Sequence, residues 1–226
     1  MPRTTERIVD LTHPLEPSMP VFPLDPKPLI LTWTKLPFHP YDSELLHCGT
    51  HTGTHIDAPS HFVKGADPVE TLKPASCIAP GIILDFRELA PRASIGVDHL
   101  RRAEGKLGTQ VEEGSAVLIW TAWSRNWKAT NYLRDYPGLT EEAAQYLADR
   151  EVALVGVDSA NLDHPDAAGF PAHKTLLGNG IPIVENLTRI GLIRSSWFTF
   201  VALPLPIVGA TGSPVRAIAV VGWRVG

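Results

Sequence analysis

Short runs of apolar and β-branched residues recur along the chain, and glycine, proline or other turn-forming residues bound most of them. Such runs are typical of β-strands. Several of them lack alternation between apolar and polar positions, which indicates strands that are buried on both faces. The predicted strands are 7–12, 29–33, 81–86, 116–121, 152–157, 198–204 and 215–225.

Three other segments carry helical patterns and helix-end signals. Thr140 and Asp98 stand where N-caps are expected, and Pro171 stands near the start of the third segment, with Gly178 past its end. Strands outnumber helices, and no repeat or linker interrupts the chain. The pattern therefore predicts one strand-rich α/β domain over residues 1–226. The predicted helices are 97–108, 140–150 and 171–180.

Composition and charge narrow the class of protein. With 226 residues, 44% of them hydrophobic, the chain can bury a substantial core. The net charge of −4 argues against a nucleic-acid or membrane partner. No apolar stretch is long enough for a transmembrane helix, so we expect a soluble, cytoplasmic protein. Cys48 and Cys77 make neither a disulfide framework nor a thiolate zinc site, and we expect both to be reduced.

The stretch HTGTHIDAPSH holds His51, His55, Asp57 and His61 within eleven residues. A lone histidine usually has a structural role, such as capping a turn, but crowded imidazoles repel each other once protonated unless a cation keeps them neutral. In a straight strand His51 and His55 would lie about 13 Å apart, which is too far for two ligands of one ion. The chain must therefore bend, and Gly53 lies midway between the two histidines. The spacing predicts a bent, extended segment that presents two nitrogens and one oxygen to a divalent ion.

Three protein ligands leave an open coordination position, which is the catalytic arrangement. Imidazole and carboxylate without thiolate suit Zn²⁺, Mn²⁺ or Fe²⁺. Asp57 has two oxygens and can bridge to a second ion, for which AHKTLLGNGIPIVEN offers His173 and Glu185. Glu185 lies in an apolar run where burial is expected, and a buried acid requires a partner. His61 is then the free imidazole and the candidate general acid–base.

These residues match a known pattern. HxGTHxDxPxH, followed by a histidine and a glutamate twelve residues apart ahead of NL, resembles the cyclase family of metal-dependent hydrolases, which includes bacterial kynurenine formamidases and isatin hydrolases. The segments DLTHPLEPSMPVFP and LVGVDSANLD extend the resemblance over most of the chain. It implies a swivelling β/β/α domain and a homodimer or higher homo-oligomer. Position by position, it implies a first metal bound by His51, His55 and Asp57, a second bound by Asp57, His173 and Glu185, and proton transfer by His61.

The resemblance also suggests the reaction. Phe22-Pro23-Leu24 stands where formamidases often have an aromatic Trp-Pro-Gly that packs on substrate, so Phe22 is a candidate for stacking on a substrate ring, and equally a candidate core residue. The predicted reaction is hydrolysis of a small amide, a formamide or a cyclic amide, by metal-activated water. The alternatives are a metal-assisted cyclase, dehydratase or lactonase, and a non-catalytic metal-binding protein. Asp158, at the end of a predicted buried strand, either orients a ligand histidine or caps the following turn.

Overall fold

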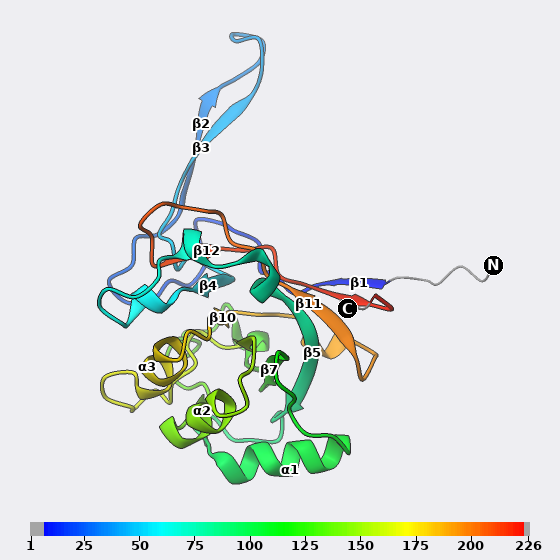
Figure 1. Cartoon of the computed structure of the whole chain (residues 1–226). Helices are drawn as coiled ribbons and strands as arrows, with labels where there is room; N and C mark the ends of the chain where they lie inside the picture. Colours follow the sequence, from blue (N-terminus) through cyan, green and yellow to red (C-terminus); the bar gives the residue numbers. More distant parts are fainter. Residues whose placement is uncertain (1–6, 224–226) are drawn as a thin grey trace, which may run out of the picture.

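The computed structural model describes residues 7–223, and a curled mixed sheet forms its centre (Figure 1). Nine strands make up this sheet: β1 (Arg7–Asp10), β4 (His55–Asp57), β5 (Ile78–Asp85), β7 (Ala116–Trp120), β9 (Leu154–Val157), β10 (Ile183–Glu185), β11 (Phe198–Val201), β12 (Gly212–Pro214) and β13 (Ile218–Val221). Their order is β1-β13-β11-β5-β7-β9-β10-β4-β12. The central strands β5, β7, β9 and β10 run parallel, and the outer strands pair antiparallel.

Two smaller pairings lie outside the central sheet. β2 (Leu29–Thr34) and β3 (Ser43–His47) form an antiparallel hairpin that projects far from the rest of the molecule (Figure 1). β6 (Ser94–Ile95) and β8 (Gly138–Leu139) form a short parallel pair. Each predicted strand overlaps an observed one, although residues 224–225 of the last prediction lie outside the described part of the chain. The sequence did not predict β3 or β12 as strands.

Three α-helices within residues 7–223 gather on one side of the sheet: α1 (Val97–Leu107), α2 (Glu141–Ala148) and α3 (Pro171–Gly178) (Figure 1). The predicted cap of α2 is confirmed, because the Thr140 side chain accepts a hydrogen bond from the Ala143 amide. The predicted cap of α1 is wrong. Gly96 occupies the N-cap position and Asp98 lies in the first turn, where its carboxylate still faces the positive helix end. Gly178 is the last residue of α3 and not a residue beyond it.

The central strands bury side chains on both faces, as their lack of alternation predicted. Val117 and Ile119 of β7 join a cluster with the helices, whereas Ala116 and Leu118 join a second cluster inside the curl of the sheet. No helix within residues 7–223 has the length and apolar character needed to cross a membrane. Cys48 and Cys77 are both free thiols, as expected.

Candidate metal centre and active site

Strand β4 supplies His55 and Asp57 from inside the sheet. It lies between β10 and β12, and the antiparallel register sets Glu185 opposite His55 and Gly212 opposite Asp57. Directly opposed residues in antiparallel strands have neighbouring side chains. His55 Nε2 accordingly lies 3.7 Å from Glu185 Oε2 and 3.3 Å from Asp57 Oδ1. Residues that are 130 positions apart in sequence are thereby brought together.

The bend before β4 occurs at Gly53, as the sequence predicted. Gly53 has a positive φ of 71°, which favours glycine. Its carbonyl accepts a hydrogen bond of 2.8 Å from His55 Nδ1 and one of 3.0 Å from Asn186 Nδ2. Because a carbonyl can only accept, His55 carries its proton on Nδ1. Nε2 is therefore the ring nitrogen that lies beside the two carboxylates and is open to a metal.

His173 enters the centre from the first turn of α3. Its Nδ1 donates a hydrogen bond of 2.5 Å to Asp163, whose carboxylate also accepts from the backbone amides of Ala172 and His173. His173 Nε2 lies 3.1 Å from Glu185 Oε1 and 3.4 Å from Asp57 Oδ2. A carboxylate behind an imidazole, as here, is the usual partner of a metal-binding histidine. The sequence reasoning missed Asp163; its only signal was a carboxylate in the turn-rich segment between β9 and α3.

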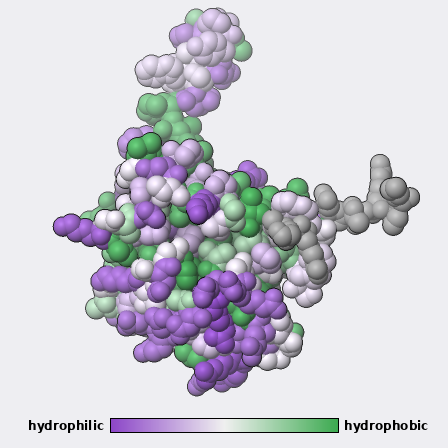
Figure 2. Space-filling model, viewed as in Figure 1, coloured by the Kyte–Doolittle hydropathy of each residue, from purple (hydrophilic) through white to green (hydrophobic). Residues whose placement is uncertain are grey.

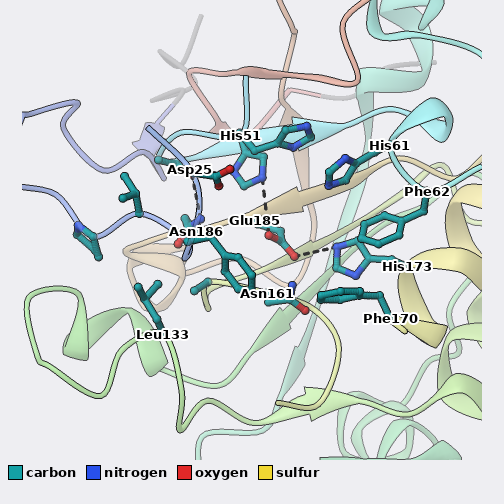
Figure 3. Close-up of a pocket in the computed structure, with 16 residues that line it drawn as sticks. Asp25, His51, His61, Phe62, Leu133, Asn161, Phe170, His173, Glu185 and Asn186 are labelled. Atoms are coloured by element: carbon teal, nitrogen blue, oxygen red, sulfur yellow. Dashed lines mark hydrogen bonds and ion pairs between the residues drawn. The ribbon is translucent and has the colours of Figure 1, made fainter. Parts of the chain in front are cut away.

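His51 and His61 complete the cluster, and both rings lie at the edge of the pocket (Figure 3). His51 Nδ1 lies 2.6 Å from Asp57 Oδ1, and His51 Nε2 is hydrogen-bonded to Thr211 Oγ1 at 2.8 Å. The His61 ring stacks on His51 with centroids 3.8 Å apart. Thr211 was also missed, and nothing in its local sequence indicates this contact.

The potential ligand atoms form two groups that share Asp57. Within each group they lie within 4.8 Å of one another. This division differs from the one that the resemblance implies, because Glu185 groups with His55, and His61 groups with His51. The groups are His51, Asp57 and His61, and His55, Asp57 and Glu185.

Burial and charge show that a divalent cation fits this centre. Asp57 Oδ2 is buried and makes no hydrogen bond with the described residues, which is costly for a carboxylate oxygen without a cation. Burial opposes a charged imidazole, yet the Asp57 and Glu185 carboxylates raise the pKa of His55 to about 9. The pKa of His173 is raised as well, because the Asp163, Asp57 and Glu185 carboxylates around it outweigh its burial. The centre therefore requires positive charge, which a metal would supply while keeping the imidazoles neutral.

A pocket of about 210 Å³ opens onto the centre (Figure 3). Phe22 lines it and is half-buried, so the structure places this residue at the pocket and not in the core. Phe62 and Phe170 form an aromatic wall, with ring centroids 5.1 Å apart, and Phe62 lies 4.9 Å from the His173 ring. Burial lowers the pKa of His61 to about 4, so its ring is neutral near pH 7.

Asp158 has a structural role at some remove from the ligands. Its carboxylate accepts hydrogen bonds from the Thr121 amide at 2.8 Å and the Thr121 hydroxyl at 2.7 Å, and Ser124 Oγ lies 3.4 Å away. Asp158 thus caps the turn that follows the neighbouring strand β7. It does not cap the turn that comes after Asp158 in the sequence. Asp163, five residues later, is the carboxylate that orients a histidine.

Comparison with known proteins relates the chain to one family. The model of the Cyclase family, described as "Putative cyclase", matches residues 9–164. A kynurenine formamidase of Bacillus cereus is 31% identical over 215 residues, covering 95% of this chain and 97% of the relative. A kynurenine formamidase of Geobacillus thermodenitrificans is 32% identical, with coverage of 92% and 95%.

Solved structures agree over nearly the whole chain. Isatin hydrolase A from Ralstonia solanacearum superposes with a TM-score of 0.87 at 29% identity, covering 97% of this chain and 93% of that one. Isatin hydrolase A from Labrenzia aggregata, bound to benzyl benzoate, gives 0.89 at 27% identity, with coverage of 96% and 94%. These similarities confirm the predicted fold class and the prediction of a metal-dependent hydrolase. The chain belongs to the cyclase family.

Proposed function

We propose that the chain hydrolyses a small amide, either an arylformamide such as N-formylkynurenine or a cyclic amide such as isatin. One observation carries the proposal: the Nε2 atoms of His55 and His173 converge with the Asp57 and Glu185 carboxylates beside an aromatic pocket. The kynurenine formamidases and isatin hydrolases among the relatives point to these two substrate classes.

In this proposal five side chains hold the divalent ion or ions. Zinc and manganese both suit a donor set of imidazoles and carboxylates without thiolate. Asp57 belongs to both groups of potential ligands and would be shared if two ions were bound. When bound, a divalent ion supplies a Lewis acid that polarises a carbonyl and lowers the pKa of water. The five residues are His51, His55, Asp57, His173 and Glu185.

The remaining pocket residues move the proton and orient the substrate. The neutral His61 ring can take a proton from the attacking water at a ring nitrogen and deliver it to the leaving amide nitrogen, while its stacking on His51 fixes the ring plane. Phe22 packs on an aromatic substrate ring, with Phe62 and Phe170 on the pocket wall. The pocket excludes bulk water from most of the buried carboxylate and imidazole groups.

Turnover by metal-reconstituted protein tests the proposal. Protein stripped with a chelator and reloaded with Zn²⁺ or Mn²⁺ is assayed on N-formylkynurenine, isatin and simple arylformamides, with bound metal measured in each sample. We expect hydrolysis of at least one class only in reloaded samples, with solvent oxygen in the product. Full activity in stripped protein would sink the metal mechanism, and a product without solvent oxygen would favour a cyclase or dehydratase.

The cytoplasmic location and the metal identity stay predictions. The homodimer or higher homo-oligomer likewise stays a prediction.

A further inference from the structure

Two buried asparagines line the active-site pocket, and the metal centre uses neither of them (Figure 3). Asn161 and Asn186 are each only 7% exposed. Asn161 belongs to the segment that also holds Asp163, and Asn186 directly follows Glu185. An amide side chain has two donor hydrogens and one acceptor oxygen, so its protein partners decide which of these it offers to a ligand.

Asn161 presents its amide nitrogen to the pocket. Its Oδ1 accepts a hydrogen bond of 2.8 Å from the Asp163 backbone amide, which can only donate, so the oxygen is fixed on that side. Its Nδ2 makes no hydrogen bond with the described residues, yet it is not among their fully enclosed polar atoms without a partner. Because Asn161 is otherwise buried, Nδ2 is open to the pocket with two donor hydrogens available.

Two partners fix the amide of Asn186. Its Nδ2 donates to the Gly53 carbonyl at 3.0 Å, and its Oδ1 accepts from the Tyr132 hydroxyl at 2.8 Å. Because the Gly53 carbonyl can only accept, the amide nitrogen and oxygen cannot exchange places. Burial raises the pKa of the Tyr132 hydroxyl well above its usual value, so this group keeps the proton that it donates. One hydrogen of Nδ2 has no partner among the described residues and is left for a ligand in the pocket.

Backbone contacts join the two asparagines. The Asn186 amide donates to the Ser159 carbonyl at 2.9 Å, and Ser159 Oγ donates to the Asn161 carbonyl at 2.9 Å. The Asn186 carbonyl accepts a hydrogen bond of 2.7 Å from Thr54 Oγ1. Asn186 has a φ of 57°, in the left-handed region that residues other than glycine seldom adopt. Such a conformation, held by bonds from segments far apart in sequence, points to a functional constraint on this side chain.

The rest of the pocket shows which substrate groups suit these donors. Within residues 7–223 its lining contains no lysine or arginine, so the amides are not accompanied by a cationic side chain that would favour a carboxylate. Neutral amide hydrogens suit a neutral carbonyl oxygen. Phe62 and Phe170 add an aromatic wall, whereas the outer surface over α1 and α2 is mostly hydrophilic (Figure 2). The pocket thus combines a metal-binding end, an aromatic wall and neutral hydrogen-bond donors.

We propose that Asn161 and Asn186 donate hydrogen bonds to a second carbonyl oxygen of the substrate, distinct from that of the amide that is hydrolysed. This inference rests on the proposed function, in which the scissile carbonyl lies at the metal centre. N-formylkynurenine and isatin both carry a ketone on the ring carbon next to the one that bears the amide nitrogen. The substrate class is therefore an aromatic amide with a carbonyl group ortho to the amide. Asn161, with two free hydrogens, makes the main contact.

These donors give the site a physical basis for rejecting other amides. A substrate that lacks the ortho carbonyl displaces water from the two amides and leaves buried N–H groups without an acceptor, which is costly. Tyr132 is a positioning residue in this scheme, because its hydroxyl acts on the substrate only by holding the Asn186 amide.

Turnover of two matched substrates by the metal-loaded protein tests the proposal. In ortho-acetylformanilide the second carbonyl is present, whereas in ortho-isopropenylformanilide a CH2 group replaces its oxygen and the shape is nearly kept. The ratio of the two kcat/KM values isolates the contact, because loss of metal or damage to the fold lowers both values together. Asn161→Ala should lower the wild-type ratio by about 10-fold, the scale of one neutral hydrogen bond. Asn186→Ala should lower the ratio as well.

Thr54→Val is the matched control. It removes the side-chain bond to the Asn186 carbonyl, but Thr54 does not line the pocket, so the ratio should stay at the wild-type value. Tyr132→Phe removes only the hydroxyl that fixes the Asn186 amide, and it should lower the ratio while metal content is unchanged. A ratio that falls as far in Thr54→Val as in Asn161→Ala would contradict a direct contact with the substrate.

Binding of the amine products gives a readout that needs no catalysis. In calorimetric titrations, ortho-acetylaniline should bind the wild type about 10-fold more tightly than Asn161→Ala, whereas ortho-isopropenylaniline should bind both proteins alike. An unchanged kcat/KM ratio in Asn161→Ala, or equal affinities of the two proteins for ortho-acetylaniline, would overturn the proposal. If the wild type hydrolyses neither formanilide, the proposed function fails, and the binding titration still decides whether Asn161 contacts the carbonyl.

Discussion

His173 donates a hydrogen bond of 2.5 Å from Nδ1 to Asp163, and this bond decides which imidazole nitrogen faces the metal centre. With Nδ1 bonded to Asp163, Nε2 is the ring nitrogen that faces Asp57 and Glu185 and is open to a metal. The same carboxylate accepts two backbone amides at the start of α3, so the orientation of the ring and the start of the helix depend on one side chain.

Asp163→Asn should lower metal affinity by roughly 10- to 100-fold, the usual cost of losing a carboxylate behind a ligand histidine. The amide can accept one of the present hydrogen bonds, but it lacks the negative charge that makes His173 a strong ligand. Chelator-competition titration measures the change. Asp166→Asn is the control, because Asp166 is an exposed acid of the same segment paired with Arg92. Equal affinities in both variants would contradict the role of Asp163.

Asp57→Ala should lose more metal than His51→Ala or His55→Ala. The reason is that Asp57 belongs to both groups of potential ligands, so its removal damages both. Elemental analysis of the purified variants gives the comparison. His164→Ala, which removes a histidine bonded to the Arg92 carbonyl away from the centre, should keep wild-type metal content. If all three ligand variants keep their metal, the segment 51–57 is not the ligand set.

His61→Ala should keep its metal while kcat falls by roughly 10²-fold or more, the scale of general acid–base catalysis. Its ring stacks on His51 and lies close to Asp57, near enough to exchange a proton at the centre. Metal content and steady-state kinetics must be measured on the same preparation. Loss of metal would make His61 a ligand, and an unchanged rate would make it structural.

Gly212→Ala should displace His51 and reduce both metal content and activity. A Cβ at this position would lie 2.5 Å from His51 Cε1 and 2.7 Å from the Ile56 carbonyl. The carbonyl is backbone of β4, so the His51 ring would have to leave its place beside Asp57. Gly105→Ala is the control, because nothing lies within 4 Å of its added Cβ and alanine favours the interior of α1. Normal metal content in Gly212→Ala would show that the β4–β12 contact is looser than described.

The stability contributed by Asp158 should fall as pH rises. Burial raises its pKa from 3.8 to about 6, so between these values the folded state binds more protons than the unfolded state. This contribution is present below about pH 4 and is lost as pH rises through 6. Urea unfolding of metal-free wild type and Asp158→Asn should show the wild type losing on the order of 2–3 kcal/mol relative to the variant between pH 4 and pH 7. A difference that does not change with pH would be inconsistent with a buried, titrating Asp158.

The sequence alone predicted features that depend on neighbouring residues. The strand at 116–121 was recognisable because apolar side chains occupy both faces, and the helix at 140–150 because Thr140 caps a helical pattern. The bend at Gly53 followed from the spacing of His51 and His55, since two ligands of one ion cannot stand 13 Å apart. In each case the physical constraint acts within about ten residues.

Only the tertiary structure decided how distant segments meet. Glu185 faces His55 because of the register between β10 and β4, and His51 meets Thr211 because the loop before β12 returns beside it. The sequence predicted an apolar strand at 29–33, but it did not show that this strand projects into solvent while β7 lies in the core. Apolar runs report which side chains avoid water. Which surface covers them depends on chain topology and strand register, and these are set by the packing of the whole molecule.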